Sequence, residues 1–362
     1  MYNIISPINS LGYGVAGLNI CKSLNQSSPV SLFPIGQPSV TNQSDHQQVS
    51  EMISNAKMPN FSAPCVRIWH QHDMSQFVGS GLKVGFPIFE LDNFTDTEKH
   101  HLSFPDKIFV CSDWAKGVIE QTTNRDYDEI YVIPLGVDRS IFRPVEPNGG
   151  ETYTFFNCGK WEVRKGHDII VEAFNKAFDS SDKVELKMMC ENPFNSEEEE
   201  KNWTDLYNNS KLGDKISLIP RVATHEEVYN IMATVDCGVF PARAEGWNLE
   251  LLEMMACNKP VIATDYSAHT EFCTSENSFL IDPSEVEPAF DGKWFDGKTG
   301  SWAKLEDRHV EELAEYMRHV YKNNVRENPN GVDTAKIRDD EGLKGDKKPL
   351  YAIFQIRDFA LK

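Results

Sequence analysis

PARAEGWNLELLEMMACNKPVIATD, residues 241–265, reads as a loop, a helix and a strand in succession. Apolar residues recur at helical spacings after the loop, at Leu249, Leu252, Met255 and Ala256. Asn258-Lys259-Pro260 predicts the end of that helix, and Val261–Thr264 predicts a strand directly after it. The stretch therefore predicts one helix–strand repeat of an α/β sheet.

Two carboxylates stand eight residues apart in this stretch. Glu245 falls in the loop and Glu253 on the first turns of the helix, so both can face one cleft. The free N–H groups at the start of the helix would lie between them, where a phosphate binds well. Carboxylates for sugar hydroxyls beside N–H groups for a diphosphate suit a nucleotide-sugar site. The alternative is a loop carboxylate and a solvated helix residue, and the rest of the chain argues against it.

Length and charge limit the function classes. A chain of 362 residues with 40% hydrophobic residues suits two domains with buried cores. A formal net charge of −19 disfavours stable binding to nucleic acid or to an anionic membrane surface. The apolar runs are no longer than strands, so no transmembrane segment is predicted. Residues 1–10 lack a basic region before an apolar core, so we expect no signal peptide.

The cysteines indicate a reducing compartment. None of the eight forms a close pair in the sequence, which disfavours a disulfide framework or a zinc site. We therefore expect a cytoplasmic protein. The cysteines are Cys21, Cys65, Cys111, Cys158, Cys190, Cys237, Cys257 and Cys273.

The first half of the chain alternates strands and helices, which predicts a parallel doubly wound sheet. Such sheets bind ligands at the carboxyl ends of their strands. The expected strands are Asn3–Ser6, Val30–Pro34, Val66–His70, Lys83–Glu90, Lys107–Cys111 and Ile130–Ile133. Candidate site residues at their ends are the glycines of the GxGxxG at 12–17, including Gly14, and His70, His72, Asp73 and Glu90.

The pattern restarts after a stretch rich in proline and glycine at 142–150, which predicts a linker. We expect domains at 1–140 and 151–323, an amphipathic helix over 306–323, and an extension at 324–362 that could pack back on the first domain. Within the extension, residues 324–348 read as a loose connection. The expected strands of the second domain are Tyr153–Cys158, Val184–Cys190, Lys215–Ile219, Cys237–Phe240 and Val261–Thr264.

Several motifs in one order resemble retaining glycosyltransferases of the GT-B fold, in particular glycosyltransferase family 4. The family pattern of two glutamates with seven residues between them resembles Glu245-Gly246-Trp247-Asn248-Leu249 through Glu253. Further likenesses are Pro241–Gly246, Asn258–Asp265, Gly159-Lys160 with Lys165-Gly166, and Val132–Asp138. The resemblance implies two Rossmann-like doubly wound domains that face each other across a cleft.

The resemblance also implies roles for residues that match the family motifs. Glu253 would bind the ribose of the donor, and Glu245 would lie beside the transferred sugar. Lys160 and Lys165 would neutralise the diphosphate, which gains charge as the glycosidic bond breaks. Backbone groups at Gly14, Trp247, Asn248 and Leu249 would complete the phosphate site, and Arg221 with Val222 would contact the base. Asn248 stands where glycine is frequent in the family.

The first domain departs from the family pattern. Glu90 occupies the place where many members carry a catalytic histidine, as in a subset of the family. His72 is then a further catalytic candidate, with His70 and Asp73 on the acceptor side, although either histidine could be structural. Asp126-Tyr127-Asp128 matches a metal-binding Asp-x-Asp but falls in a polar turn of the first domain. We therefore expect no metal and no cofactor other than the donor substrate.

The sequence thus predicts a metal-independent retaining glycosyltransferase (EC 2.4) that moves a sugar from a nucleotide-diphosphate sugar to a hydroxyl acceptor. The acceptor is open between a glycan, a lipid and a small molecule, and the sugar, the base and the oligomeric state are also open. Rival functions are a sugar-phosphate synthase, a GT-B transferase acting on modified DNA bases, and a non-catalytic nucleotide-sugar or carbohydrate-binding module.

Overall fold

The computed structural model describes residues 1–147 and 149–341. The chain divides into two compact units, the first built mainly from Met1–Leu135 and the second from Gly136–Ile337. Each unit contains one six-stranded parallel sheet. The alternation of strands and helices expected from the sequence is therefore present in both halves.

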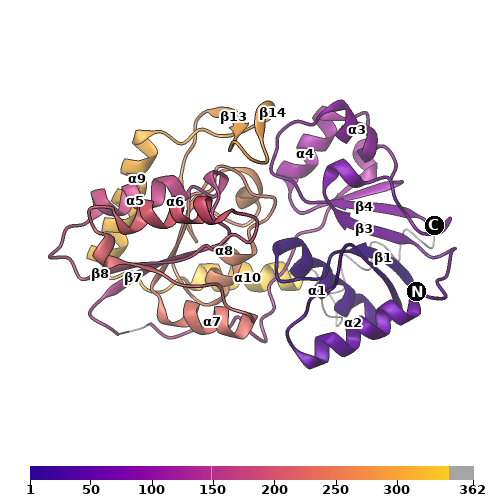
Figure 1. Ribbon diagram of the computed structural model, residues 1–362, viewed down its shortest axis with the longest axis horizontal. Helices are drawn as coiled ribbons and strands as arrows, with labels where there is room; N and C mark the ends of the chain where they lie inside the picture. The colour runs from indigo at the N-terminus through magenta and orange to yellow at the C-terminus, as the bar shows by residue number, and fades with distance from the viewer. Residues whose placement is uncertain (148, 342–362) are drawn as a thin grey trace. The chain divides into compact units, whose positions relative to one another are not determined.

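The sheet of the first unit has the strand order β2-β1-β3-β4-β5-β6. In Figure 1, α1 and α2 cover one face of this sheet, and α3 and α4 cover the other. The order reverses at β1, so a ligand is expected at the carboxyl ends of β1 and β3. The strands are β1 Tyr2–Ser6, β2 Val30–Pro34, β3 Cys65–Trp69, β4 Lys83–Pro87, β5 Lys107–Val110 and β6 Ile130–Val132. The helices are α1 Gly12–Ser27, α2 Gln43–Asn55, α3 Asp96–Leu102 and α4 Asp113–Thr122, with short 3₁₀ turns at Gln71–Asp73 and Tyr127–Glu129.

The sheet of the second unit has the order β12-β11-β10-β7-β8-β9. The order reverses between β7 and β10, which lie side by side. The loops that follow these two strands therefore hold the expected binding position. The strands are β7 Tyr153–Cys158, β8 Val184–Met189, β9 Ile216–Leu218, β10 Cys237–Phe240, β11 Val261–Thr264 and β12 Phe279–Ile281.

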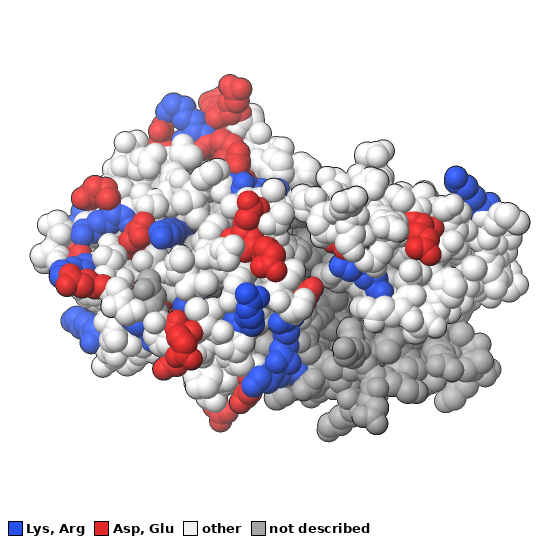
Figure 2. All heavy atoms as spheres, turned by 90° about the horizontal axis from the view of Figure 1, so that it is seen from below, with Lys and Arg blue, Asp and Glu red and all other residues white. Residues whose placement is uncertain are grey.

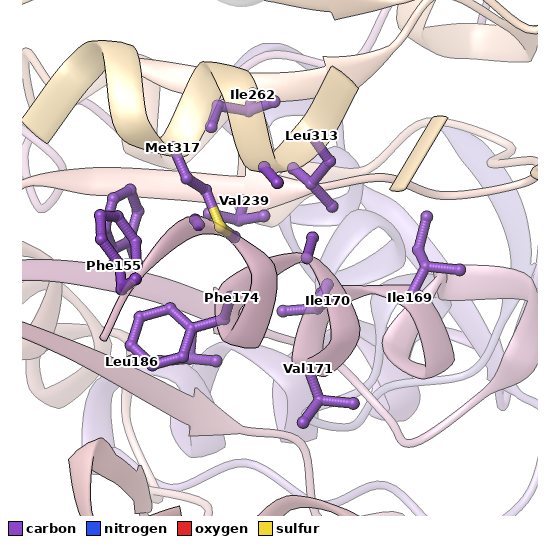
Figure 3. Packing of buried hydrophobic residues seen from close by; sticks show 14 of the residues in the cluster. Phe155, Ile169, Ile170, Val171, Phe174, Leu186, Val239, Ile262, Leu313 and Met317 are labelled. Atoms are coloured by element: carbon purple, nitrogen blue, oxygen red, sulfur yellow. The ribbon is translucent and has the colours of Figure 1, made fainter. Parts of the chain in front are cut away.

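Helices on both faces enclose the core of the second unit. Figure 1 shows α5, α6 and α9 on one face of the sheet and α7 on the other. A cluster of buried side chains lies under α5 and α9, where Leu313 and Met317 of α9 meet Ile170 and Phe174 of α5 (Figure 3). The helices are α5 His167–Ala177, α6 Glu197–Asn208, α7 His225–Thr234, α8 Leu249–Ala256, α9 Asp307–Lys322 and α10 Pro329–Glu341. Short 3₁₀ turns span Val163–Lys165, Gly213–Lys215 and Ser267–Glu271.

Several elements of the second unit differ from the expectation. Strand β12, which pairs with β11 at the edge of the sheet, was not expected. A hairpin of β13 (Val286–Phe290) and β14 (Asp296–Ala303) lies between β12 and α9. The expectation of a loose connection over 324–348 is wrong for its described part, because α10 begins at Pro329. Asn328 caps this helix by accepting from the N–H of Gly331 at 2.9 Å, and proline fits the first helical position. The expected packing of residues 349–362 lies outside the described residues.

All eight cysteines are buried, and each is a thiol outside any disulfide. Burial raises the pKa of several of them, including Cys21 and Cys273, to about 12. None of these thiols is therefore prepared for chemistry in the folded chain.

Candidate functional site

The loops after β7 and β10 bring two predicted site residues together. Lys165 follows β7, Glu245 follows β10, and the Lys165 Nζ lies 2.7 Å from the Glu245 Oε1. Arg164 binds the other oxygen of the same carboxylate, with 2.9 Å between its Nη1 and the Glu245 Oε2. A carboxylate held by two cations thus stands where the strand order of the second sheet reverses.

Lys160 joins this arrangement through a second carboxylate. Its Nζ lies 2.8 Å from the Glu162 Oε1, and the Glu162 Oε2 lies 2.6 Å from the Arg164 Nη2. The groups form one chain of alternating charge, Lys160–Glu162–Arg164–Glu245–Lys165. Three cations and two carboxylates leave one net positive charge at this position.

These ion pairs decide the protonation of the buried groups. Burial would raise the pKa of Glu245, but Arg164 and Lys165 hold that pKa well below its usual range. Burial would likewise lower the pKa of Lys165, whereas Glu245 and then Glu250 raise it. Burial also raises the pKa of Glu162, but Arg164 and then Lys160 outweigh burial and lower that pKa to about 2. All three groups are therefore charged at neutral pH.

Two glycines allow the loop at 159–166, which carries Lys160 and Lys165 and is called the lysine loop below, to adopt this conformation. Gly159 has φ 147°, and a Cβ there would lie 3.0 Å from the Lys165 Cδ. Gly166 has φ 73°, and a Cβ there would lie 2.0 Å from the Pro241 carbonyl oxygen. The loop therefore packs closely on Lys165 and on the chain leading to Glu245 only because both positions lack a side chain.

His167 fixes the same loop from inside the unit. Its Nδ1 accepts from the N–H of Glu162 at 3.1 Å, and its Nε2 then donates to the Asn157 Oδ1 at 2.9 Å. Burial, followed by Lys165, lowers the pKa of His167 to about 3. A neutral imidazole of one tautomer thus connects the lysine loop to β7.

The start of α8 carries the predicted backbone groups of Trp247, Asn248 and Leu249. Asn248 is the N-cap, with φ 79°, and its Oδ1 accepts from the N–H of Leu251 at 3.2 Å. The N–H groups of Leu249 and Glu250 have no partner within the helix. Glycine is the usual residue for such a φ, and asparagine tolerates it best among the others, which explains the departure from the family pattern at this position.

His269 secures the cap of α8 from the turn after β11. Its Nε2 lies 2.9 Å from the Asn248 Nδ2, and its Nδ1 lies 3.0 Å from the Thr264 carbonyl oxygen. Burial lowers the pKa of His269, so the ring is neutral, with Nδ1 donating to the carbonyl. In the same turn, the Ser267 Oγ accepts from the N–H of Glu245 at 2.8 Å.

Glu253 and Trp247 offer buried polar groups that the described chain does not use. Glu253 on α8 is buried, and within residues 1–147 and 149–341 its carboxyl group makes no hydrogen bond or ion pair. Burial, followed by the nearby Glu250, raises the pKa of Glu253 well above its usual value. The buried indole Nε1 of Trp247 likewise has no partner in this part of the chain. Buried polar groups of native proteins nearly always have a hydrogen-bond partner, so both groups are candidate ligand contacts.

The predicted base-contacting residues lie after β9. The N–H of Arg221 lies 3.3 Å from the Glu191 Oε2, and both residues line a pocket of about 570 Å³. The pocket is otherwise formed by the loop after β8 and the start of α6, with Asn192, Pro193, Asn195, Glu197 and Glu200. Val222 follows Arg221 and is partly buried.

In the first unit, His70 and His72 stack on each other with ring centroids 5.1 Å apart. The Tyr13 ring packs on the edge of His70, and the Tyr13 hydroxyl, 3.4 Å from the His70 Nδ1, donates to the Ile88 carbonyl. Burial, followed by Glu90, raises the pKa of Tyr13. His70 and His72 follow β3 and Glu90 follows β4, at the strand ends expected from the sequence, and Tyr13 of α1 lies among them.

Asp73 and Gly14 have visible structural roles. The buried Arg67 pairs with the Asp73 carboxylate at 2.5 Å and donates to its carbonyl at 2.6 Å. Gly14 lies inside α1, where a Cβ would lie 2.3 Å from the backbone N of Asn9. Their acceptor-side and phosphate roles stay predictions. Among the described residues, no group of three or more His, Cys, Asp or Glu side chains could hold a metal ion, and Asp126 and Asp128 lie at a 3₁₀ turn.

Sequence reasoning missed Arg164, Glu162, His269 and Tyr13. Arg164 and Glu162 lie between the two predicted lysines, and their spacing follows no periodic pattern because the segment is a loop. Tyr13 lies inside the glycine motif, where the glycines dominated the interpretation. His269 is four residues beyond the quoted stretch, and only the fold brings it to Asn248.

Comparison with known proteins places these residues in a family. Residues 152–292 match the family described as "Glycosyl transferases group 1". This segment of the second unit is thereby identified as a glycosyl transferases group 1 domain. The matched residues include both ion-paired lysines, Glu245 and Glu253, so the family resemblance expected from the sequence is confirmed.

Curated relatives of the glycosyl transferases group 1 family match over part of their length. One is the D-inositol 3-phosphate glycosyltransferase of Pseudarthrobacter chlorophenolicus, 27% identical over 150 residues, which are 38% of this chain and 34% of the relative. Another is the GDP-mannose-dependent alpha-(1-6)-phosphatidylinositol dimannoside mannosyltransferase of Mycobacterium tuberculosis, 25% identical over 158 residues, 41% of this chain and 39% of the relative. The chain thus spans between a third and two fifths of these relatives.

Solved structures with this fold match over the whole chain. Sucrose-phosphate synthase from Thermosynechococcus elongatus has a TM-score of 0.72 at 15% identity, covering 100% of this chain and 99% of that one. Anabaena HepE, solved with UDP-glucose, has a TM-score of 0.70 at 13% identity, covering 99% and 98%. The predicted GT-B fold class, with two parallel α/β sheets, is confirmed. No described helix is long and apolar enough to cross a membrane.

Proposed function

We propose that the chain is a retaining, metal-independent glycosyltransferase that moves a sugar from a nucleotide-diphosphate sugar to a hydroxyl acceptor. The observation that carries this proposal is the Glu245 carboxylate held between Arg164 and Lys165 where the second sheet reverses, next to the start of α8. This position combines cations, free helix N–H groups and carboxylates, as a sugar diphosphate requires.

The diphosphate would bind against the net positive charge of the ion-pair chain. Lys165 and Lys160 would turn from their carboxylate partners toward the phosphates, and the N–H groups of Leu249 and Glu250 would donate from the other side. As the glycosidic bond breaks, charge grows on the leaving diphosphate, and cations already in contact with it stabilise that change. Lysines here do the work that a divalent cation does in metal-dependent transferases.

Glu253 would bind the ribose of the nucleotide. Its buried carboxyl group lacks a partner in the described chain, and two ribose hydroxyls would satisfy it. The base would lie in the pocket beside Arg221 and Val222. On the acceptor side, Glu90 and His72 are the proposed groups that receive or orient the acceptor hydroxyl, supported by their place at strand carboxyl ends.

The rival functions have less support. A nucleic-acid enzyme usually carries a basic face, whereas the formal net charge here is −19 and acidic and basic side chains are interspersed on the face shown in Figure 2. A pure binding module needs no buried, cation-paired carboxylate beside the phosphate position, because that group serves the reacting centre.

A thermal-shift screen of nucleotides and nucleotide sugars tests the proposal, followed by release of nucleotide from the best donor. We expect one nucleoside diphosphate and its sugar to raise the melting temperature and the sugar to be slowly hydrolysed without acceptor. The anomeric configuration of the released sugar, followed by NMR, tests retention. Binding without any turnover would favour the non-catalytic module, and an inverted product would overturn retention alone.

A further inference from the structure

The β13–β14 hairpin is attached at its base to the loop that carries Glu245. The N–H of Ala303 donates to the Arg243 carbonyl at 2.9 Å, and the Arg243 Nε lies 3.3 Å from the Glu287 Oε1. Arg243 itself is fixed by a bidentate pair with Asp168 at 2.8 Å. The base of the hairpin is therefore part of the same rigid framework as the candidate donor site.

The tip of the hairpin is attached to the loop after β8. The Lys293 Nζ donates to the Phe194 carbonyl at 2.6 Å and to the Asn195 Oδ1 at 3.1 Å, and it pairs with Glu199 at 3.0 Å. The same loop lines the pocket beside Arg221. The hairpin thus reaches from the Glu245 loop to the rim of the proposed base pocket.

The two attached segments carry three exposed aromatic side chains, which we name the tip patch: Phe194, Phe290 and Trp294. They are 48%, 61% and 59% exposed, and the Phe194 and Trp294 rings meet edge to face at 6.1 Å. The adjoining Phe194 and Trp294 rings form an exposed apolar surface on anchored segments, and such contiguous surfaces are typical of interaction sites. The Lys160 Nζ lies 5.2 Å from the centre of the Phe194 ring, so the tip patch is continuous with the ion-pair chain of the donor site.

The charge around the tip patch restricts its ligand. Residues 194–200 and 290–298 contain six carboxylates (Glu197, Glu198, Glu199, Glu200, Asp291 and Asp296) against two lysines, Lys293 and Lys298. With Lys160 beside Phe194 also counted, an excess of three negative charges disfavours phosphate-rich partners such as nucleic acid or an anionic membrane. A neutral polyol suits it, because the C–H faces of a pyranose ring pack on aromatic rings while carboxylates accept from its hydroxyls.

We propose that the tip patch is an acceptor subsite that binds a neutral saccharide. The inference rests on the proposed transferase function and narrows its acceptor from a glycan, lipid or small molecule to a molecule with an uncharged sugar ring. Trp294 and Phe194 supply the packing surface, and Lys293 holds it in place.

Saccharide binding by the full-length protein tests the proposal. The probes are maltotriose and the methyl glycosides of glucose, galactose, mannose and N-acetylglucosamine, followed by tryptophan fluorescence and saturation-transfer NMR. We expect saturable binding of at least one probe, about tenfold weaker in Trp294→Ala. Lys293→Ala, which releases the tip without removing a ring, should weaken binding too. Phe61→Ala is the matched control, since Phe61 is also 61% exposed but lies in the first unit.

Nucleotide release without acceptor separates this proposal from the transferase function. Stimulation of nucleotide release by the saccharide should be lost in Trp294→Ala, whereas Phe61→Ala should keep both the basal and the stimulated rate. Failure of the wild-type chain to use any donor would overturn the transferase proposal and leave the binding result to decide the subsite. The subsite is overturned if no probe binds, if Trp294→Ala binds as tightly as wild type, or if Trp294→Ala instead abolishes binding to phosphatidylinositol vesicles.

Discussion

Glu245 and Glu253 lie eight residues apart and are almost equally buried, 5% and 8% exposed, yet their surroundings are electrostatic opposites. Glu245 lies between Arg164 and Lys165, and its pKa is held well below the usual range in spite of burial. Glu253 faces another carboxylate, Glu250, and burial raises its pKa. One loop thus keeps a buried carboxylate charged, and the helix beside it favours a buried neutral acid.

Burial alone does not decide the state of a carboxyl group, because the penalty is similar at both positions. The difference arises from the loop after β7, which brings two cations to Glu245 and none to Glu253. An ionised carboxylate stabilises the positive charge that develops on the transferred sugar. A protonated carboxyl group instead binds hydroxyls without attracting ions. The comparison therefore predicts catalysis at Glu245 and binding at Glu253.

The largest expected effect follows from removing the cation on the reacting side. Lys165→Ala should lower kcat by about 10²–10³-fold, because a fixed group that stabilises transition-state charge is typically worth that much. Glu245→Gln should also lower kcat, with a smaller effect on the affinity for free nucleotide. Steady-state kinetics measures both. Lys176→Ala is the control, since Lys176 forms an exposed ion pair with Glu311 in the same unit. Wild-type kinetics with intact melting temperatures in Lys165→Ala and Glu245→Gln would refute the assigned site.

Removing Arg164 should raise the pKa of Glu245, so that its protonation becomes more like that of Glu253. The pKa of Glu245 lies below its unfolded value, so the stability it contributes is present above that value and is lost as the pH falls through the folded pKa. Arg164→Met takes away one of the two cations and should raise that pKa by about 1–3 units. Stability should therefore begin to fall at a higher pH in Arg164→Met than in the wild-type chain as the solution is acidified, and Arg164→Lys should restore part of the difference. Lys165, Glu250, Glu162 and His269 also bear on this site, and an unchanged onset in acid-unfolding curves would show that Arg164 does not set the pKa.

Glu253→Gln should mainly raise the donor KM. The ribose does not react, so its contact is similar in the ground and transition states. A neutral hydrogen bond of about 0.5–1.5 kcal/mol corresponds to a change of about 2- to 12-fold. An increase above about 100-fold would show that the donor binds the ionised carboxylate, and a fall in kcat alone would reverse the roles of the two glutamates.

A smaller effect, on the stability of the protein without nucleotide, should reveal whether Glu253 is protonated. Its folded pKa is raised, so its favourable contribution is present below the unfolded pKa and is lost as the pH rises through the folded value. Glu253→Gln cannot ionise and should therefore melt a few degrees higher than wild type at alkaline pH and nearly equally at pH 4. Melting curves without nucleotide measure this, and an equal difference at both pH values would contradict a raised pKa.

The smallest expected effect is that of a chelator. Because Lys160 and Lys165 supply the positive charge in the proposed mechanism, EDTA should leave the rate unchanged. Loss of activity that Mg²⁺ or Mn²⁺ restores would show that the ion-pair chain does not replace a metal, and that Asp126 and Asp128 deserve reconsideration.

Periodicity was sufficient to predict most strands, including Tyr153–Cys158 and Cys237–Phe240 with their observed bounds. It failed for the β13–β14 hairpin, whose second strand contains glycines at 297 and 300 and little alternation. The site residues were found where motifs mark them, at Glu245, Glu253 and Lys165. Their partners were missed because Arg164, His269 and Tyr13 act through contacts that no local pattern encodes. The face-to-face arrangement of the two domains stays a prediction.

Because every cysteine is buried, the rate at which a reagent modifies the thiols reports the unfolding of the chain. Cys21, Cys65 and Cys111 lie in the first unit and the other five in the second, so a thiol reagent reaches each set only when its own unit opens. Mass spectrometry of alkylated peptides would then time the opening of the two units separately in one sample. A single cysteine placed on the surface, for example at Trp294, could carry a dye without removal of any native thiol.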